Sequence, residues 1–401
     1  MRYQFPIITH LNDVLPAIEG RDEFIVVQKD GYQIVNYAVV MEDTFPPVET
    51  AGGSAKMRAA QSLLKAIRRE CRGLVFDMDG KIIGRRYHKF FNANEREETR
   101  MEKIDWFKPH RILEKLDGSM ISPIPVKGAI RWTTKMGITD TSMQAEEFVA
   151  KNPNYVLLAE EAIAHAMTPI FEWTSRQQRI VIDYEKDNLI LTAVRDNILG
   201  TYVSYEDLLE WGKLYNIDVV VAHEINEDLI TAIQKWEGAE GIVVRFNDGH
   251  MVKIKSEWYV LRHKSKDAIT REKNVLEYIV NDRVDDVLPF LEENDQKQII
   301  KFRDEFWDGL GLEAARLTRY VDSIYKMGMD KKRWAIEIMP AFREQQNAAT
   351  TGLVFSIFDG KDARDVIVDH IRKNINTQTK VEAVRYLWGG AKWSYNFDGD
   401  V

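Results

Sequence analysis

The sequence predicts an α+β protein, with a first domain of antiparallel hairpins and flanking helices and a second, all-α domain. Pairs of short apolar segments joined by Gly- or Asp-containing turns recur until about residue 262, which is typical of antiparallel sheets. Beyond that residue the apolar pattern is mostly helical. A chain of 401 residues also exceeds the size of one ordinary core. We therefore expect domains at residues 1–262 and 263–401.

Turns and caps predict the elements of the first domain. A hairpin is expected over residues 23–40, with its turn at the Asp30–Gly31 pair. Ser54 is the expected N-cap of an Ala- and Leu-rich helix that runs to about Arg69. Further hairpins are expected over residues 73–91, 121–135 and 240–256. Other strands are expected over residues 170–175, 179–185, 188–197 and 199–204. A helical segment interrupted near Pro153 is expected over residues 144–167, and further helices over residues 204–217 and 227–237.

Composition argues against several classes of protein. The net charge of −8 counts against binding nucleic acid through overall charge, although cations can still gather in one cleft. A single cysteine, Cys71, rules out an intramolecular disulfide, and one Cys with 8 scattered His argues against a structural zinc site. No stretch reaches the roughly 20 apolar residues of a membrane helix, and the N-terminus has no signal-peptide pattern. We therefore expect a cytoplasmic protein with no membrane partner.

Lys115 is the first candidate for chemistry because it precedes a short acidic turn, Asp117-Gly118-Ser119, just before a predicted strand. Glycine lets another backbone approach closely, and a carboxylate can orient a ribose hydroxyl. On its own, K-x-D-G is typical of an exposed turn. The motif therefore gains meaning only from its neighbours.

Cations and carboxylates recur on later predicted strands in a fixed order. Lys135 lies in the strand that follows Lys115, and Glu172 lies in an aromatic strand. Glu240 precedes a glycine at the start of another strand. Lys253 and Lys255 are two residues apart, so they share one strand face while their neighbours face the core. Two lysines on one face require either solvent or an anionic partner.

This order of motifs resembles the covalent nucleotidyltransferase superfamily of ligases and capping enzymes, in which K-x-D-G, an acidic strand, E-G-x-V and K-x-K follow one another. Residues 70–80 and 89–92, with Glu95, resemble the phage ATP-dependent RNA ligases that repair broken tRNA, the RNA ligase 1 type. Residues 179–181 and 253–260 resemble them too. The resemblance covers about residues 37–266 and thins beyond.

The resemblance implies a reaction in three steps that uses ATP and Mg²⁺. Lys115 takes AMP as a phosphoramidate, the AMP passes to the 5′-phosphate of an RNA, and a 3′-hydroxyl displaces it. The implied partners are single-stranded RNA ends, such as those of a cleaved tRNA, bound by a monomer in the cytoplasm of an infected host. The residues implied to bind the nucleotide are Tyr37, Arg72, Lys89, Phe91, Glu114, Asp117, Gly118, Lys135, Glu172, Glu240, Lys253 and Lys255. Those implied to bind the metal are Glu240, Asp285 and Asp286.

A lysine nucleophile must first lose its proton, and an ordinary lysine with a pKa of about 10.4 is almost fully charged at pH 7. We expect Lys135, Lys253 and Lys255 to disfavour the ammonium form of Lys115 before ATP arrives, and then to bind phosphate oxygens.

Several of these assignments have ordinary alternatives. Arg72 could pair only with Asp77, Phe91 could pack in the core, and Asp285–Asp286 could be an exposed helix start. An idle RNA-end-binding protein with the same fold is one alternative function. A DNA ligase or capping relative is another, although these would carry a β-barrel domain where this chain predicts helices. Residues 52–56 lack the spacing of a P-loop, which argues against a P-loop kinase.

Overall fold

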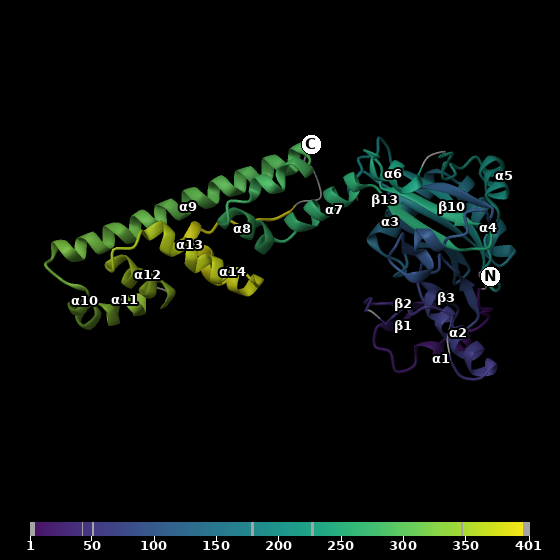
Figure 1. Ribbon diagram of the computed structural model, residues 1–401, viewed down its shortest axis with the longest axis horizontal. Coiled ribbons are helices and arrows are strands. Elements are labelled where there is room, and N and C mark those ends of the chain that lie inside the picture. Colours follow the sequence, from purple (N-terminus) through teal and green to yellow (C-terminus); the bar gives the residue numbers. More distant parts are fainter. Residues whose placement is uncertain are drawn as a thin grey trace. The chain divides into compact units, whose positions relative to one another are not determined.

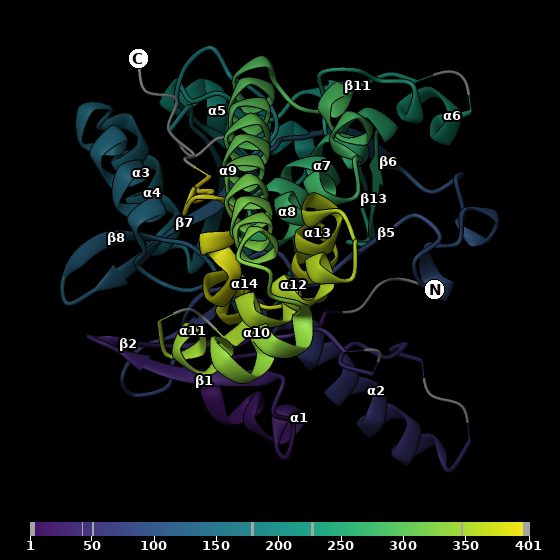
Figure 2. The same cartoon turned by 90° about the vertical axis from the view of Figure 1, so that its left-hand side faces the viewer.

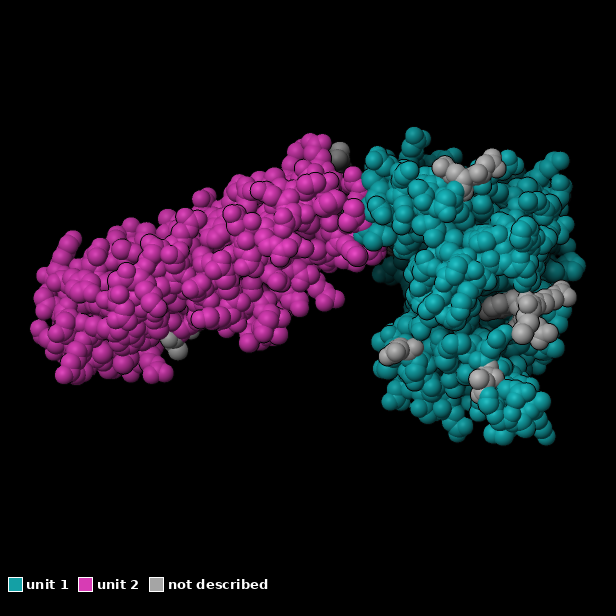
Figure 3. Space-filling model, in the orientation of Figure 1, with its two compact units in different colours: residues 1–260 teal, residues 261–401 magenta. Residues whose placement is uncertain are grey.

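The computed structural model describes residues 5–41, 43–49, 52–177, 180–225, 228–345 and 348–395 (Figure 1). They form two compact units, Met1–Val260 and Leu261–Val401, which Figure 3 colours separately. The sequence places this boundary two residues later, after residue 262. The predicted fold class is confirmed, because the first unit contains antiparallel sheets with helices and the second is helical.

The first sheet is formed by two consecutive hairpins and is covered by a helix. Its strand order is β1-β2-β3-β4. Ser54 caps the covering helix, α2, by accepting a hydrogen bond from the backbone N–H of Met57. The predicted first hairpin and the predicted helix start are therefore confirmed. The bounds are β1 (Phe24–Lys29), β2 (Tyr32–Tyr37), β3 (Leu74–Phe76), β4 (Ile82–Gly84), α1 (Leu15–Ile18) and α2 (Ala55–Glu70).

The second sheet has the order β10-β9-β7-β8, and three helices pack on it to bury an aromatic-rich core. The predicted hairpin over residues 121–135 is confirmed, and it pairs through β7 with β9. The bounds are β7 (Ser119–Val126), β8 (Ala129–Thr133), β9 (Met167–Thr174), β10 (Asn188–Asp196), α3 (Asp140–Lys151), α4 (Asn154–Ala164) and α5 (Tyr205–Tyr215).

The third sheet has the order β11-β6-β12-β13-β5 and carries the chemistry described below. Its central strand, β12, begins at Gly241, which lies opposite Lys115 of β6 on one side and Lys255 of β13 on the other. The bounds are β5 (Phe91–Asn92), β6 (His110–Lys115), β11 (Ala222–His223), β12 (Gly241–Phe246), β13 (Met251–Lys255) and α6 (Leu229–Gln234). Short 3₁₀ turns cover Leu11–Asp13, Glu97–Thr99 and Met101–Lys103.

Two predicted strands are wrong. The described part of residues 179–185, from residue 180 on, is a loop, because the backbone N–H groups of Val181 and Ile182 donate to the carboxylate of Asp117 and not to a neighbouring strand. Residues 199–204 form only a single bridge, because Gly200 turns the chain back at φ +72° directly after β10. Arg179 and Glu227, which the sequence analysis placed in a strand and a helix, lie outside the described residues.

The second unit is built around one long helix, α9 (Glu293–Lys326). Its buried residues recur every three or four positions, so one stripe of the helix faces α12 and α13, which lie beside it in Figures 1 and 2. The described residues beyond 262 contain no strand. No helix in the described ranges has the length and apolar character needed to cross a membrane. The remaining bounds are α7 (Glu257–Ile269), α8 (Glu272–Val280), α10 (Lys331–Glu337), α11 (Met339–Gln345), α12 (Ala348–Phe358), α13 (Ala363–Lys373) and α14 (Gln378–Val384). Val284–Asp286, Leu288–Phe290 and Arg385–Trp388 are 3₁₀ turns.

A buried cluster of charges ties the first two sheets together. Glu70, at the end of α2, lies 3.1 Å from Nε of Arg85 and 2.8 Å from Nη1 of Arg195, and all three side chains are almost fully buried. Burial alone would raise the pKa of Glu70, but the charges of Arg195 and Arg85 outweigh it and lower that pKa from 4.5 to about 2.

We predict that Glu70→Gln lowers the free energy of unfolding of the first unit by about 3–5 kcal/mol, because it leaves two buried guanidinium groups without their anion. The stabilisation by Glu70 should be complete above its ordinary pKa of 4.5 and should be lost as the pH falls towards about 2. Urea unfolding followed by intrinsic fluorescence measures both effects. The control is Glu206→Gln, which breaks an exposed pair with Arg111. An equal loss in the two variants would contradict the prediction.

Candidate active site

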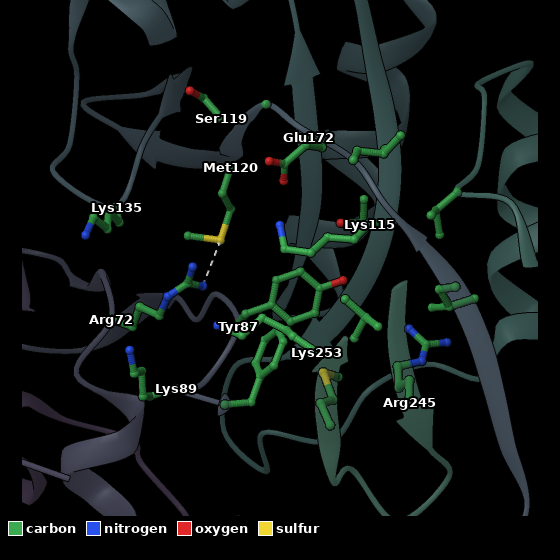
Figure 4. Close-up of a pocket in the computed structure, with 18 of the residues that line it drawn as sticks. Arg72, Tyr87, Lys89, Lys115, Ser119, Met120, Lys135, Glu172, Arg245 and Lys253 are labelled. Carbon is green, nitrogen blue, oxygen red and sulfur yellow. Dashed lines mark hydrogen bonds between the residues drawn. The ribbon is translucent and has the colours of Figure 1, made fainter. Parts of the chain in front are cut away.

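Side chains from all three sheets meet in one pocket of about 500 Å³, which is large enough for a nucleotide (Figure 4). It brings together most of the residues that the sequence analysis singled out. From that set, the lining residues are Tyr37, Arg72, Lys89, Glu114, Lys115, Gly118, Lys135, Glu172, Lys253 and Lys255.

Glu240 links two of the lysines. Its Oε2 lies 2.7 Å from Nζ of Lys115, and its Oε1 lies 2.9 Å from Nζ of Lys255. The strand register explains this arrangement, because Gly241 is opposite both Lys115 and Lys255 and Glu240 immediately precedes it. The Glu240 side chain is 4% exposed, whereas those of Lys115 and Lys255 are 21% and 32% exposed. The two amines therefore remain accessible from the pocket, while the buried carboxylate of Glu240 forms ion pairs with both of them.

Gly241 permits this close arrangement. Its φ is +140°, and a Cβ atom there would lie 2.1 Å from the carbonyl oxygen of Ile254. Gly118 has a similar role in the K-x-D-G turn, where a Cβ atom would lie 2.4 Å from the carbonyl oxygen of Trp173 in β9. The two glycines let strands and turns approach closely enough to set Lys115 between Glu240 and the end of β9.

Among the lysines of the pocket, Lys253 has the most strongly lowered pKa. Burial, with the charges of Lys89, Lys115 and Arg72, lowers the pKa of Lys253 from 10.5 to about 7. From the sequence, we expected these charges to act on Lys115 instead. The structure shows that Lys253 lies at the centre of the crowd, because it projects from the middle of β13 into the pocket while Lys115 is held by Glu240.

A second group of cations surrounds the ring of Tyr37. The Nζ atoms of Lys135 and Lys89 lie 4.8 Å and 5.4 Å from the ring centre, and Arg72 lies close enough to act on its hydroxyl. Burial would raise the pKa of Tyr37, but Arg72, Lys89 and Lys135 outweigh it and lower that pKa. Figure 4 shows Arg72, Lys89 and Lys135 together on one side of Lys115. Three cations in one part of a pocket form a site for polyvalent anions.

Glu172 faces Lys115 from β9 (Figure 4). Burial, with a contribution from the charge of Glu240, raises its pKa from 4.5 to about 7, although Lys115 acts in the opposite direction. A carboxyl group that is partly protonated near neutral pH can both donate and accept hydrogen bonds, which suits a pair of ribose hydroxyls.

Comparison with known proteins identifies the family of this chain. An RNA ligase family matches residues 70–259, and the C-terminal domain of T4 RNA ligase 1 matches residues 266–382. A Thermovibrio ammonificans protein that bears the name of an RNA ligase is 31% identical over 293 residues, which span 69% of this chain and 70% of that protein. This chain belongs to the RNA ligase family.

Other relatives of this RNA ligase are more distant. RNA ligase 1 of bacteriophage TS2126 is 25% identical over 337 residues, which span 76% of this chain and 79% of that protein. The solved structure of an archaeal ATP-dependent RNA ligase is 13% identical and covers 64% of each chain with a TM-score of 0.41. That structural likeness is too low to carry an argument.

Three residues that were assigned to nucleotide binding do not line the pocket of the ligase, and one of them is Glu240, which lies behind Lys115 and Lys255. Phe91 is 1% exposed and packs in the hydrophobic core under the first sheet, so its ring is not part of the pocket lining. Asp117 is also buried, and its carboxylate accepts hydrogen bonds from the backbone of residues 181 and 182 and from the hydroxyl of Tyr259 at 2.7 Å. Asp117 therefore holds the turn after Lys115 in place, and it does not line the pocket.

Of the three residues that were assigned to the metal in the ligase, only Glu240 lies beside the pocket. Asp285 and Asp286 belong to the second unit, where both are exposed and Asp286 pairs with Arg283 at 2.9 Å. Within the described ranges, no three His, Cys, Asp or Glu residues gather as a metal cage. Glu172, which lines the pocket, and Glu240, which contacts two of its lysines, fit Mg²⁺ better, because this ion commonly binds one or two carboxylates together with water and substrate phosphates.

Several residues that line the ligase pocket were not predicted from the sequence. Strand alternation from Gly241 would have found Val243 and Arg245, and alternation from Lys253 would have found Met251. Tyr87 gave no such signal, because it lies in an irregular segment between β4 and β5.

We predict that the ligase takes up protons when it binds a nucleoside triphosphate at pH 7.5. The pKa of Lys253 is about 7 in the free protein, and bound phosphate oxygens should raise it. Between the pKa of the free protein and that of the complex, the complex therefore carries more protons than the free protein. Affinity should fall as the pH rises above 7. Calorimetric titration with α,β-methylene-ATP in buffers of different ionisation enthalpy measures the uptake.

Lys253→Met should remove most of this proton uptake, and Lys127→Met, at an exposed hairpin lysine, should leave it unchanged. Equal proton uptake in the wild type and in Lys253→Met would contradict the assignment.

Proposed function

We propose that this RNA ligase joins the 5′-phosphate and 3′-hydroxyl ends of single-stranded RNA through a covalent Lys115–AMP intermediate. The observation that carries the proposal is the position of Lys115 in a nucleotide-sized pocket, between a buried carboxylate and a group of cations. An amine, a carboxylate and phosphate-binding cations are the groups that adenylyl transfer to lysine requires.

In the first step, Nζ of Lys115 attacks the α-phosphorus of ATP. A P–N bond forms, the bond from the α-phosphorus to the bridging oxygen breaks, and pyrophosphate leaves. The amine must first give up a proton, and Glu240 is the carboxylate in direct contact with it at 2.7 Å. Lys253 and Lys255 lie on β13, which is separated from the strand of Lys115 by β12, and from there they can bind the α-phosphate as negative charge develops.

Bound Mg²⁺ would neutralise the charge of the departing pyrophosphate. Glu240 and Glu172 are the carboxylates that would lie beside it, with Glu240 still anchored by Lys255 once Lys115 has reacted. Arg72, Lys89 and Lys135 would bind the β- and γ-phosphates.

In the second step, an oxygen of the RNA 5′-phosphate attacks the phosphorus of Lys115–AMP. The P–N bond breaks, and AMP becomes joined to the RNA through a 5′–5′ pyrophosphate. In the third step, the 3′-hydroxyl of the other end attacks the RNA 5′-phosphorus, a phosphodiester forms and AMP leaves. After pyrophosphate has left, the cations around Tyr37 can receive the 5′-phosphate, because they no longer hold the β- and γ-phosphates.

We predict that the protein, incubated with α-labelled ATP and Mg²⁺, acquires an acid-labile labelled adduct, and that Lys115→Ala abolishes it. The same variant should still seal RNA that already carries 5′-linked AMP, because the third step does not use the amine as a nucleophile. Labelling on a denaturing gel and ligation of 5′-phosphorylated RNA into circles or concatemers measure the two activities.

Lys127→Ala, an exposed hairpin lysine, serves as the control and should label normally. A wild-type protein that binds RNA ends without labelling would support the idle binding protein and sink the proposal. Labelling by GTP in place of ATP would favour a capping activity.

The second unit is proposed to select the RNA, with the ends of a cleaved tRNA as substrate, in a monomer acting in the cytoplasm of an infected host. The match to the C-terminal domain of T4 RNA ligase 1 supports a role specific to this family. Lys264 and Arg271 are exposed basic residues near the start of the unit, and Lys266 and Lys273 are partly exposed beside them. Such a row of cations can follow a phosphate backbone, although an exposed helix start would also carry them.

We predict that Lys264→Ala combined with Arg271→Ala weakens binding of a nicked tRNA stem-loop and leaves the labelling of Lys115 by ATP unchanged. Each lost phosphate contact should reduce the slope of log affinity against log salt by about 0.7. Filter binding across a salt series measures the slope.

Lys297→Ala with Lys301→Ala is the matched control, since these exposed lysines of α9 pair with glutamates on their own helix. Identical slopes in the two double variants would contradict the role of this basic row in RNA choice.

A further inference from the structure

Arg245 is a buried arginine in the pocket that the three-step reaction leaves unused. It lies on β12, lines the pocket and is 6% exposed. Its Nη1 atom is buried and has no hydrogen-bond partner in the part of the chain that the structure describes. No carboxylate of the described residues lies within ion-pair distance of its guanidinium group.

Such an arginine is costly in the free protein. A buried charge normally requires a counter-ion or a full set of hydrogen bonds, and breaking a buried pair costs several kcal/mol for that reason. Arg85 and Arg195 share the carboxylate of Glu70. Arg86, which is also buried without a carboxylate, donates to Gly73 and Thr133. Arg245 differs from these because it lines the pocket, so a molecule that fills the pocket can supply the missing partner.

The strand register places Arg245 away from the phosphate site. Gly241 marks the level of Lys115 and Lys255, and Arg245 lies four residues further along β12, which is roughly 13 Å at about 3.3 Å per residue. Figure 4 shows Arg245 on the opposite side of Lys115 from Arg72, Lys89 and Lys135. If the β- and γ-phosphates bind those three cations, the nucleoside extends towards Arg245.

The surroundings of Arg245 suit a purine base. Tyr87, Val243 and Met251 line this part of the pocket, with Thr192 as a polar neighbour. Aromatic and aliphatic side chains cover the faces of a base, and a guanidinium group can donate to an acceptor on its edge. An adenine ring offers such acceptors at N1, N3 and N7.

We propose that Arg245 recognises the base of bound ATP, with its guanidinium group donating a hydrogen bond to a ring nitrogen of the adenine. This rests on the proposed function, because ATP must occupy the pocket. Arg245 is then a specificity residue of the adenylylation step. The adenine of ATP supplies a hydrogen-bond acceptor that the guanidinium group lacks in the free protein.

The test compares ATP with 1-deaza-, 3-deaza- and 7-deaza-ATP in single-turnover labelling of the wild type and of Arg245→Met. In the wild type, one analogue should bind about 10- to 150-fold more weakly than ATP, the factor expected for one charged hydrogen bond. Arg245→Met should bind ATP more weakly by a similar factor and should bind ATP and that analogue equally well. Methionine is close to arginine in length, so the variant keeps the packing while it removes the donor.

Arg111→Met is the matched control, because Arg111 lies opposite Arg245 on β6 but is exposed and paired with Glu206. It should discriminate among the analogues as the wild type does. The melting temperature of Arg245→Met should be no lower than that of the wild type, since no partner is orphaned. A lower melting temperature with unchanged discrimination would show that Arg245 is structural.

Equal binding of ATP and all three analogues by the wild type would overturn the assignment of Arg245, while the labelling itself would still support the adenylylation of Lys115. A wild-type protein that is not labelled by ATP would instead remove the proposed function, so the two failures are distinguishable.

Discussion

The buried carboxylate of Glu240, held between the amines of Lys115 and Lys255, is the interaction on which the rest of the site depends. It exists because β6, β12 and β13 pair in a register that sets Gly241 opposite both lysines. The ion pair between Glu240 and Lys115 must also break before Lys115 can react with ATP. In the proposed reaction, Lys115 can attack phosphorus only after it has lost a proton and left Glu240. The α-phosphate bound by Lys253 and Lys255 then supplies an anion in place of the Glu240 carboxylate.

Charge divides the pocket into two sides around this bridge. Arg72, Lys89 and Lys135 form the side that suits phosphates, and the aromatic and aliphatic side chains near Arg245 form the side that suits a base. An overall charge of −8 therefore does not conflict with a ligase that binds polyanions, because its cations are concentrated where the reaction takes place. Both Lys253 and Arg245 are unfavourable in the free protein, and in the proposed complex both gain favourable partners from the nucleotide.

The sequence could predict features that depend on local pattern. The turn at Asp30–Gly31, the cap at Ser54 and the shared face of Lys253 and Lys255 all follow from neighbouring residues. Features that depend on partners distant in sequence could not be found in this way. The role of Asp117 comes from residues 181, 182 and 259, which hold it in the core and leave the segment after residue 180 without strand pairing.

The most direct measurement is a crystal structure of the protein after reaction with ATP and Mg²⁺, with peptide mass spectrometry of the same sample. The account predicts AMP joined to Nζ of Lys115, Glu240 in contact with Lys255 alone, and the base beside Arg245. Lys253 is the alternative nucleophile, since its pKa of about 7 leaves much of its amine neutral at physiological pH. AMP on Lys253, or on no lysine of the pocket, would contradict the account.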